Sequence, residues 1–117
     1  FIYDTKFKVK KLIINFSNLL LIITIFLSNF NQANSDEIFE KGKIIFLEQG
    51  NCAACHTLAD AGSAANIGPN LNQIKPDINR VIVTVTNGIG VMPAYQGELT
   101  PEEIEAVAHY VSISAEN

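Results

Sequence analysis

The segment from Asn51 to Lys75 constrains the fold of this 117-residue chain more than any other. It is rich in small and turn-forming residues, and its apolar positions are few: Leu58, Ile67, Leu71 and Ile74. Loops without secondary structure of their own rarely exceed ~12–15 residues in a compact domain. Something other than a core of side chains must therefore organise this stretch, by giving its apolar residues a body on which to pack.

A pentapeptide at the start of the segment indicates what that body is. Cys52-Ala53-Ala54-Cys55-His56 has the pattern C-x-x-C-H, which is typical of haem attachment. Two thiols at this spacing can add to the two vinyl groups on one side of a porphyrin, which places the adjacent His56 under the iron as proximal ligand. The sequence therefore predicts one covalently bound haem c, a large planar group that could organise the segment.

Two other uses of paired cysteines are weaker. A redox-active dithiol of the thioredoxin type normally lies beside a βαβ pattern, which is absent from this sequence. A zinc site needs two further ligands, and His109 is the only histidine outside the motif.

Met92 is the best candidate for the second axial ligand. It is the only methionine of the chain, and it follows Gly88-Ile89-Gly90-Val91 and precedes Pro93, on a turn that the glycines permit and the proline stiffens. A lone methionine is usually a core filler, but haem needs a sixth ligand and no other residue is so placed. The competing ligand, His109, is expected on the exposed face of the last helix.

The motif Gly68-Pro69-Asn70-Leu71 is a candidate support for the proximal ligand. A ligating histidine almost always donates its other ring N–H to a carbonyl or carboxylate, which fixes the ring orientation. We expect the carbonyl of Pro69 to accept that hydrogen bond and Leu71 to pack on the cofactor. An ordinary turn is the alternative interpretation.

Three helices are predicted after residue 35. The first begins with Asp36 as its cap and ends near Gln49, and Gly42 in its interior suggests close approach by another element. The second extends from Pro76-Asp77 to Thr86, although its β-branched residues would also suit a strand.

The third helix has the clearest signal. Thr100-Pro101-Glu102-Glu103 forms a capping box with proline at the first helical position. The residues that follow form an apolar stripe with Tyr110 at its margin: Ile104, Val107, Ala108 and Val111.

Residues 1–35 have the layout of a secretory signal peptide. Four lysines between positions 6 and 11 precede an uncharged stretch, whose most apolar part is Leu19 to Leu27 and which ends in Ala33-Asn34-Ser35. We expect cleavage after Ser35 and a single domain at 36–117. The alternative is an uncleaved membrane anchor over residues 12–30, where several asparagines and serines dilute the apolar character.

The domain at 36–117 carries eleven acidic and four basic residues. This excess of negative charge argues against binding of nucleic acid or of an anionic membrane surface. It favours a partner with a basic or largely apolar docking patch, although it could equally serve solubility alone.

With these pieces in order, the chain resembles the class I monohaem c-type cytochromes. The resemblance covers nearly all of residues 36–117 and rests on these features: Gly42 with Phe46, the C-x-x-C-H motif, Gly68-Pro69-Asn70-Leu71, Asn87 to Ala94, and Tyr110. It implies an all-α cytochrome c fold, with three to four helices wrapped around one covalent haem. In that fold the first and last helices cross, so Gly42 and Phe46 would meet Tyr110. It also implies that Pro69 accepts the hydrogen bond from His56 and that Met92 is the distal ligand.

The segment Met92-Pro93-Ala94-Tyr95 is especially similar to the short cytochromes of photosynthetic electron transport. Members that serve photosynthesis commonly have glutamine at the position of Thr84, and similar short forms occur in respiratory bacteria, so the pathway stays open.

The resemblance implies a one-electron carrier rather than an enzyme. We expect a monomeric, soluble domain in the bacterial periplasm or the thylakoid lumen, which takes an electron from one membrane complex and gives it to another. Two alternatives remain. One is an open-site haem enzyme or sensor in which Met92 does not bind iron, and the other is a subunit of a larger complex, tethered by residues 12–30.

Overall fold

A computed structural model describes the backbone of residues 2–117, with the side chains of 2–7, 14 and 25–33 outside the description. The signal-peptide prediction depends in part on residues outside this description: Phe1, the side chain of Lys6 and the side chain of Ala33. The chain divides into two compact units, Phe1–Ser35 and Asp36–Asn117. Helix α1 has the bounds Ile2–Ile44.

Among the described residues, no helix combines the length and the apolar character that crossing a bilayer requires. Asp36 lies within α1. The expectation that it caps the start of a helix is therefore wrong, because the preceding residues are helical as well.

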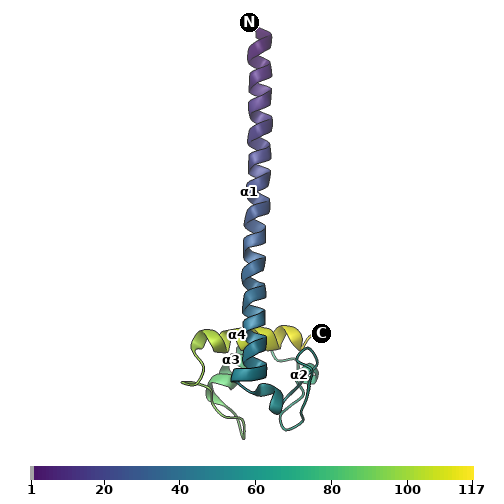
Figure 1. The fold of residues 1–117 in the computed structure, drawn as a ribbon, viewed down its shortest axis with the longest axis vertical. Coiled ribbons are helices and arrows are strands. Elements are labelled where there is room, and N and C mark those ends of the chain that lie inside the picture. Colours follow the sequence, from purple (N-terminus) through teal and green to yellow (C-terminus); the bar gives the residue numbers. More distant parts are fainter. Residues whose placement is uncertain (1) are drawn as a thin grey trace. The chain divides into compact units, whose positions relative to one another are not determined.

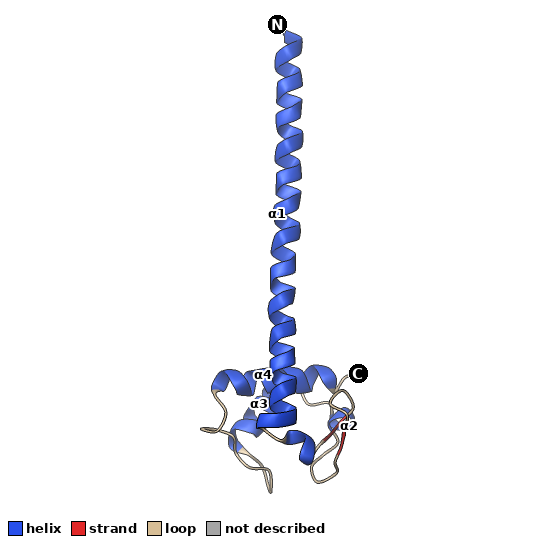
Figure 2. Cartoon of the chain, in the orientation of Figure 1, coloured by secondary structure: helices blue, strands red, loops and turns tan. Residues whose placement is uncertain are grey.

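The regular structure of the second unit is mostly helical, as predicted, with long loops between the helices (Figures 1 and 2). After α1 come the π-helical turn η1 (Ile45–Gln49), the 3-10 turn η2 (Cys52–Ala54), α2 (Leu71–Ile74), α3 (Ile78–Asn87) and α4 (Pro101–Ser114). The described strands are β1 (Thr57–Leu58) and β2 (Ser63–Ala64), which pair antiparallel with Thr57 opposite Ala64. The segment between Asn51 and Lys75 is thus built from one short hairpin and two short helical turns.

Helix α3 is a helix and not a strand, because its capping and its packing both favour helical geometry. The Asp77 side chain accepts a 3.0 Å hydrogen bond from the backbone N–H of Arg80, at the N-terminal end of α3. Val81 and Val85, four residues apart, are buried in the core.

Helix α4 begins with the predicted capping box. The Glu103 carboxylate accepts from the Thr100 N–H at 2.8 Å, and the Thr100 hydroxyl accepts from the Glu103 N–H at 3.2 Å. The backbone hydrogen bond from Thr100 lowers the pKa of Glu103. This end of the helix is therefore defined locally, by neighbours in sequence.

The end of α1 crosses α4 at Gly42, within the second unit (Figure 1). A Cβ atom at this position would lie 2.1 Å from the Ala106 carbonyl oxygen and 2.6 Å from Cβ of Tyr110. The rings of Phe39 and Phe46 meet Tyr110 edge to face, with centroids 5.0 and 5.7 Å away. The predicted crossing is confirmed, but Tyr110 is fully buried at its centre and not at the margin of the apolar stripe.

A polar contact fastens a third segment to this crossing. The Tyr110 hydroxyl donates to the Asp60 carboxylate at 2.7 Å, and Nζ of Lys43 lies 3.0 Å from the same carboxylate. The hydrogen bond from Tyr110, and then that from Lys43, lower the pKa of Asp60. The turn between β1 and β2 is thereby bound to both helices.

Candidate functional site

One large cavity of about 470 Å³ opens in the second unit. Most of its wall is apolar. The lining residues come from residues 51–56, residues 67–76, α3, the loop after α3, and α4. The predicted site residues all line it: Cys52, Cys55, His56, Pro69, Leu71 and Met92. The volume lies within the range of ~300–1,000 Å³ that is usual for cofactor sites.

Both cysteines are free thiols at the cavity wall, and both are half-buried. Cys52 lies in η2. Its backbone carbonyl accepts hydrogen bonds from the N–H groups of Cys55 (3.1 Å) and His56 (3.0 Å). This tight turn brings the three side chains to one cavity. Burial raises the pKa of Cys52 to about 11, which disfavours the thiolate that dithiol exchange requires.

The ring of His56 is held on two sides. Its Nδ1 lies 2.8 Å from the Pro69 carbonyl oxygen, a hydrogen bond in which the ring N–H is the donor. Gly68 packs against the same ring, since a Cβ there would lie 2.5 Å from Cε1 and 2.8 Å from Nδ1. The Gly68 N–H in turn donates to the Cys55 carbonyl at 2.7 Å. These contacts leave Nε2 as the nitrogen free to bind a metal ion.

Met92 lines the same cavity from the loop between α3 and α4. A short turn holds it, in which Ile89 and Met92 exchange backbone hydrogen bonds of 3.1 and 2.9 Å. Gly88 has φ +70°, and a Cβ there would lie 2.6 Å from the Met92 carbonyl oxygen and 2.7 Å from the Ala94 nitrogen. Only glycine meets both demands, so the turn that presents Met92 depends on Gly88.

Two expectations about individual residues are corrected. Leu58 does not line the cavity: it is fully buried in the protein core instead, because β1 turns it inward. His109 is half-buried and not a solvated surface residue, and its Nδ1 is buried without a hydrogen-bond partner in the described part of the chain. His109 is also absent from the cavity wall.

Tyr95 and Arg80 were missed as site residues by sequence reasoning, yet both line the cavity. The Tyr95 hydroxyl donates to the Gly50 carbonyl at 2.7 Å, across 45 residues of sequence. Arg80 is the only described residue on the cavity wall with a permanent charge. The 92–95 motif is the only sequence signal near Tyr95, and a single exposed arginine such as Arg80 gives none.

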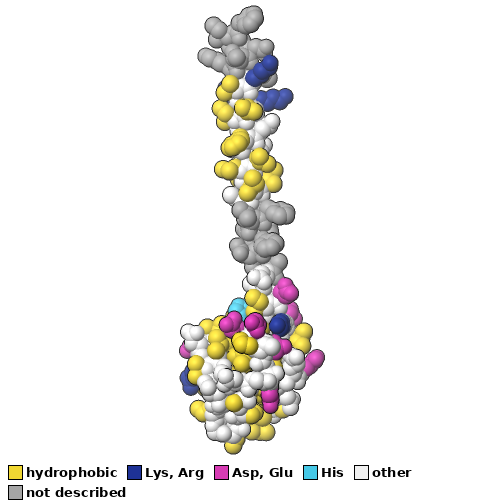
Figure 3. Space-filling model, turned by 90° about the vertical axis from the view of Figure 1, so that its left-hand side faces the viewer, with side chains coloured by type: hydrophobic (Ala, Val, Ile, Leu, Met, Phe, Trp, Pro, Cys, Tyr) yellow, Lys and Arg dark blue, Asp and Glu magenta, His cyan; other side chains and the backbone are white. Residues whose placement is uncertain are grey.

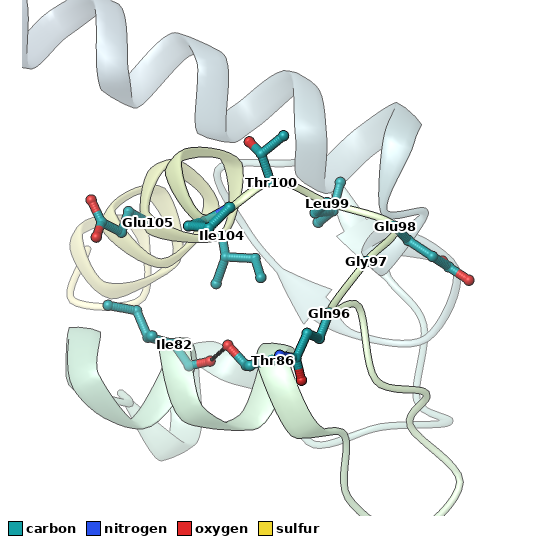
Figure 4. Close-up of a pocket in the computed structure, with 10 residues that line it drawn as sticks. Ile82, Thr86, Gln96, Gly97, Glu98, Leu99, Thr100, Ile104 and Glu105 are labelled. Atoms are coloured by element: carbon teal, nitrogen blue, oxygen red, sulfur yellow. Dashed lines mark hydrogen bonds between the residues drawn. The ribbon is translucent and has the colours of Figure 1, made fainter.

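A second cavity of about 500 Å³ lies between α3, the 96–100 loop and the start of α4 (Figure 4). At its edge the Thr86 hydroxyl donates to the Ile82 carbonyl at 2.7 Å, so this polar group is already satisfied. No cysteine, histidine or methionine lines it. It therefore lacks the residues that attach or ligate a haem.

The first cavity fits a haem by the chemistry of its walls. One apolar space is lined by two thiols, a thioether and an imidazole whose Nδ1 is already hydrogen-bonded to the Pro69 carbonyl. Zinc fits less well, because the described residues include no cluster of three or more cysteine, histidine or acidic side chains.

Comparison with known proteins agrees with this chemistry. The family profile described as "Cytochrome C oxidase, cbb3-type, subunit III" matches residues 38–111. The chain belongs to this family of monohaem c-type cytochromes. The family carries one covalent haem c, and the all-α cytochrome c fold predicted from sequence is confirmed.

Individual relatives support the assignment of this chain to the c-type cytochromes. It is 37% identical over 70 residues to cytochrome c6 of Microcystis aeruginosa, covering 56% of this chain and 86% of that protein. It is 36% identical over 104 residues to cytochrome c6 of Nostoc sp., covering 82% and 88% of the two chains. The crystal structure of the c-type cytochrome SorU from Sinorhizobium meliloti is 55% identical, with a TM-score of 0.65 over 68% of this chain and 93% of that one.

Proposed function

We propose that this cytochrome is a diffusible one-electron carrier whose haem is attached through Cys52 and Cys55 and ligated by His56 and Met92. The observation that carries the proposal is that His56 and Met92, from segments 36 residues apart in sequence, line one apolar cavity. When bound, the haem iron supplies reversible one-electron oxidation and reduction. The protein holds the two iron ligands and the loops around the haem in place.

The residues around His56 hold the proximal ligand in one orientation. The carbonyl of Pro69 engages Nδ1–H, which leaves Nε2 as the electron-pair donor and raises the basicity of the ring. Gly68 packs against the ring and restricts its rotation. A ligand that keeps its position in both oxidation states of the iron lowers the reorganisation energy of electron transfer.

Met92 is proposed to occupy the sixth position. A thioether paired with histidine raises the reduction potential relative to two histidines, because it favours ferrous iron. A site closed by two protein ligands leaves no position for substrate, so transfer of an electron is the function that this arrangement supports.

Arg80 is proposed to lie near the carboxylate groups of the haem propionates. It is exposed, it lines the cavity beside Pro76 and Thr84, and its guanidinium has no ion-pair partner in the described part of the chain. A buried or half-buried carboxylate is stabilised by a nearby cation.

The N-terminal unit, residues 1–35, is proposed to be a signal peptide that sends the domain to the periplasm or a thylakoid lumen. Support comes from its basic start and uncharged stretch. Mass spectrometry of the native N-terminus tests this: a mature chain that begins at Asp36 is expected, whereas a retained first unit would favour the tethered subunit.

The partners are proposed to be membrane electron-transfer complexes, one as donor and one as acceptor. The domain has seven more acidic than basic residues, and acidic side chains are prominent on the face shown in Figure 3. Such a surface favours a basic or apolar docking patch on the partner and should make association depend on salt.

Absorption spectroscopy of the haem-loaded protein tests the ligation. The oxidised protein should show a weak far-red band from sulfur-to-iron charge transfer, and Met92→Ala should remove it. The reduced protein should bind carbon monoxide weakly until Met92 is replaced. A wild-type protein without the band, or one that binds carbon monoxide readily, would favour the open-site enzyme or sensor.

A further inference from the structure

Among the described residues, one side-chain hydrogen bond joins the two loops that carry the proposed haem ligands. The Tyr95 hydroxyl donates to the Gly50 carbonyl at 2.7 Å. Tyr95 follows Met92 by three residues, and Gly50 precedes Cys52 by two. The bond therefore connects the Met92 loop directly to the haem-attachment segment at the cavity wall, which Tyr95 also lines.

The backbone of Tyr95 is fixed independently of this bond. Its N–H donates to the Val85 carbonyl at 2.9 Å, and its carbonyl accepts from the N–H groups of Glu98 (3.0 Å) and Leu99 (2.9 Å). Tyr95 is thus anchored to α3 and to the following turn. Because the phenol projects from a fixed backbone, its hydroxyl can hold Gly50 at a set distance.

The other side of Met92 is held by a local turn. Ile89 and Val91 line the same cavity, and Ile89 and Met92 exchange backbone hydrogen bonds of 3.1 and 2.9 Å. These bonds lie within the loop and do not connect it to the haem-attachment segment. The hydrogen bond from Tyr95 to Gly50 does make that connection, so it should help to keep the loop closed.

The hydroxyl is a dependable donor at neutral pH. Burial raises the pKa of Tyr95 above its ordinary value, so the group stays protonated. The Gly50 carbonyl lies where η1 ends, a position at which helix carbonyls lack partners within the helix.

We propose that Tyr95 is a positioning residue whose hydroxyl, through Gly50, keeps the Met92 loop closed on the haem and so limits displacement of Met92 by outside ligands. The inference rests on the proposed function. It assigns to Tyr95 a role that its hydrocarbon ring alone cannot perform.

The test is imidazole binding to the oxidised, haem-loaded protein, followed by loss of the far-red band. Tyr95→Phe removes the hydroxyl and keeps the ring. Loss of a hydrogen bond that acts only in the closed state should tighten apparent imidazole binding by about threefold to tenfold. The reduced variant should likewise bind carbon monoxide more tightly than the wild type.

Tyr110→Phe is the matched control. It also removes a 2.7 Å hydrogen bond from a tyrosine hydroxyl, to Asp60, but this residue is absent from the cavity wall. Urea unfolding should show at least as large a loss of stability in Tyr110→Phe, because its partner is a charged carboxylate, while only Tyr95→Phe changes imidazole binding. Equal changes in both variants would show a general loss of stability and overturn the inference.

The outcomes separate the two proposals. A far-red band in the wild type, together with unchanged imidazole binding in Tyr95→Phe, would overturn the role of Tyr95 and leave the ligation by Met92 intact. A wild type without the band would overturn the proposed ligation, and the role of Tyr95 with it.

Discussion

The Pro69 carbonyl oxygen and Nδ1 of His56 lie 2.8 Å apart, although 13 residues separate them in the chain. The contact is possible because Gly68, which has no side chain, packs against the imidazole. The adjacent Gly68 and Pro69 therefore act together, one by admitting the ring and the other by orienting it.

Gly68→Ala should disturb His56 without changing either ligand. The added Cβ would lie 2.5 Å from Cε1, well inside van der Waals contact, so the ring must move or the loop must shift. Overpacking of this kind costs about 1–3 kcal/mol. We expect a lower urea midpoint and altered haem absorption in the loaded protein.

Gly62→Ala is the control for that substitution. Gly62 has φ +64° and open space around its Cβ position, so alanine there brings backbone strain of about 1–2 kcal/mol but no contact with the haem site. Its absorption spectrum should match that of the wild type. An unchanged spectrum in Gly68→Ala would refute the steric role of Gly68.

Gly42→Ala should separate the crossing helices. Its Cβ would meet the Ala106 backbone at 2.1 Å, and a helix backbone cannot give way as a flexible side chain can. Although alanine favours a helix by ~1 kcal/mol over glycine, the clash should outweigh this gain and leave a net loss of at least about 1 kcal/mol. Chemical denaturation of the loaded protein measures it, and a stabilised variant would contradict the close approach.

Asp60→Asn should change the dependence of stability on pH. The pKa of Asp60 is lowered in the fold, chiefly by the hydrogen bond from Tyr110 and then by Lys43. Its stabilising contribution is therefore complete above the unfolded pKa, 3.8, and is lost as the pH falls through the lower folded pKa. The variant should be less stable than the wild type at pH 7, with a smaller difference at pH 3.

Urea unfolding at the two pH values measures this difference. Glu116→Gln is the control, because its ion pair with Lys75 is long, 3.6 Å, and exposed. Such pairs contribute little to stability. If Asp60→Asn lowers the free energy of unfolding by the same amount at both pH values, the stabilising role of the ionised Asp60 carboxylate would be refuted.

The form without haem should be largely unfolded. Without the cofactor, the mostly apolar wall of a cavity of about 470 Å³ would lose the group that covers it, and a small domain has only about 5–15 kcal/mol of stability to lose. Circular dichroism of Cys52→Ser with Cys55→Ser, which prevents attachment, is expected to show little helix. A native helical signal would mean that the side-chain core suffices.

Arg80→Gln should lower the reduction potential. Removal of a cation at the edge of the haem cavity makes the ferric state relatively more favourable, and for an exposed group we expect a shift of about 20–40 mV, smaller at high salt. Redox titration measures this shift. Lys75→Gln removes an equal charge from a residue outside the cavity wall and should shift the potential less.

Much of the site could be predicted because its information is local. The spacing of Cys52, Cys55 and His56 follows from the size of the porphyrin, and the glycines before Met92 and the capping box at Thr100 are short-range patterns. Gly42 also indicated a close contact, since a glycine inside a helix has a cost that packing must justify. Family membership was accessible for this reason, and the all-α fold and the crossing of α1 and α4 followed from the family resemblance that these motifs carry.

Other features depended on contacts between distant parts of the chain. The sequence placed Tyr110 at the margin of a stripe and Asp36 at the start of a helix, whereas the fold buries the first and places the second inside α1. No local pattern pairs Asp60 with Tyr110 or Tyr95 with Gly50, which are 50 and 45 residues apart. The sequence by itself determined which groups can hold a haem, because that chemistry resides in residue types and short spacings. Only the tertiary structure decided which distant side chains secure the loops around it, because a hydrogen bond depends on positions in space that the whole packed chain defines.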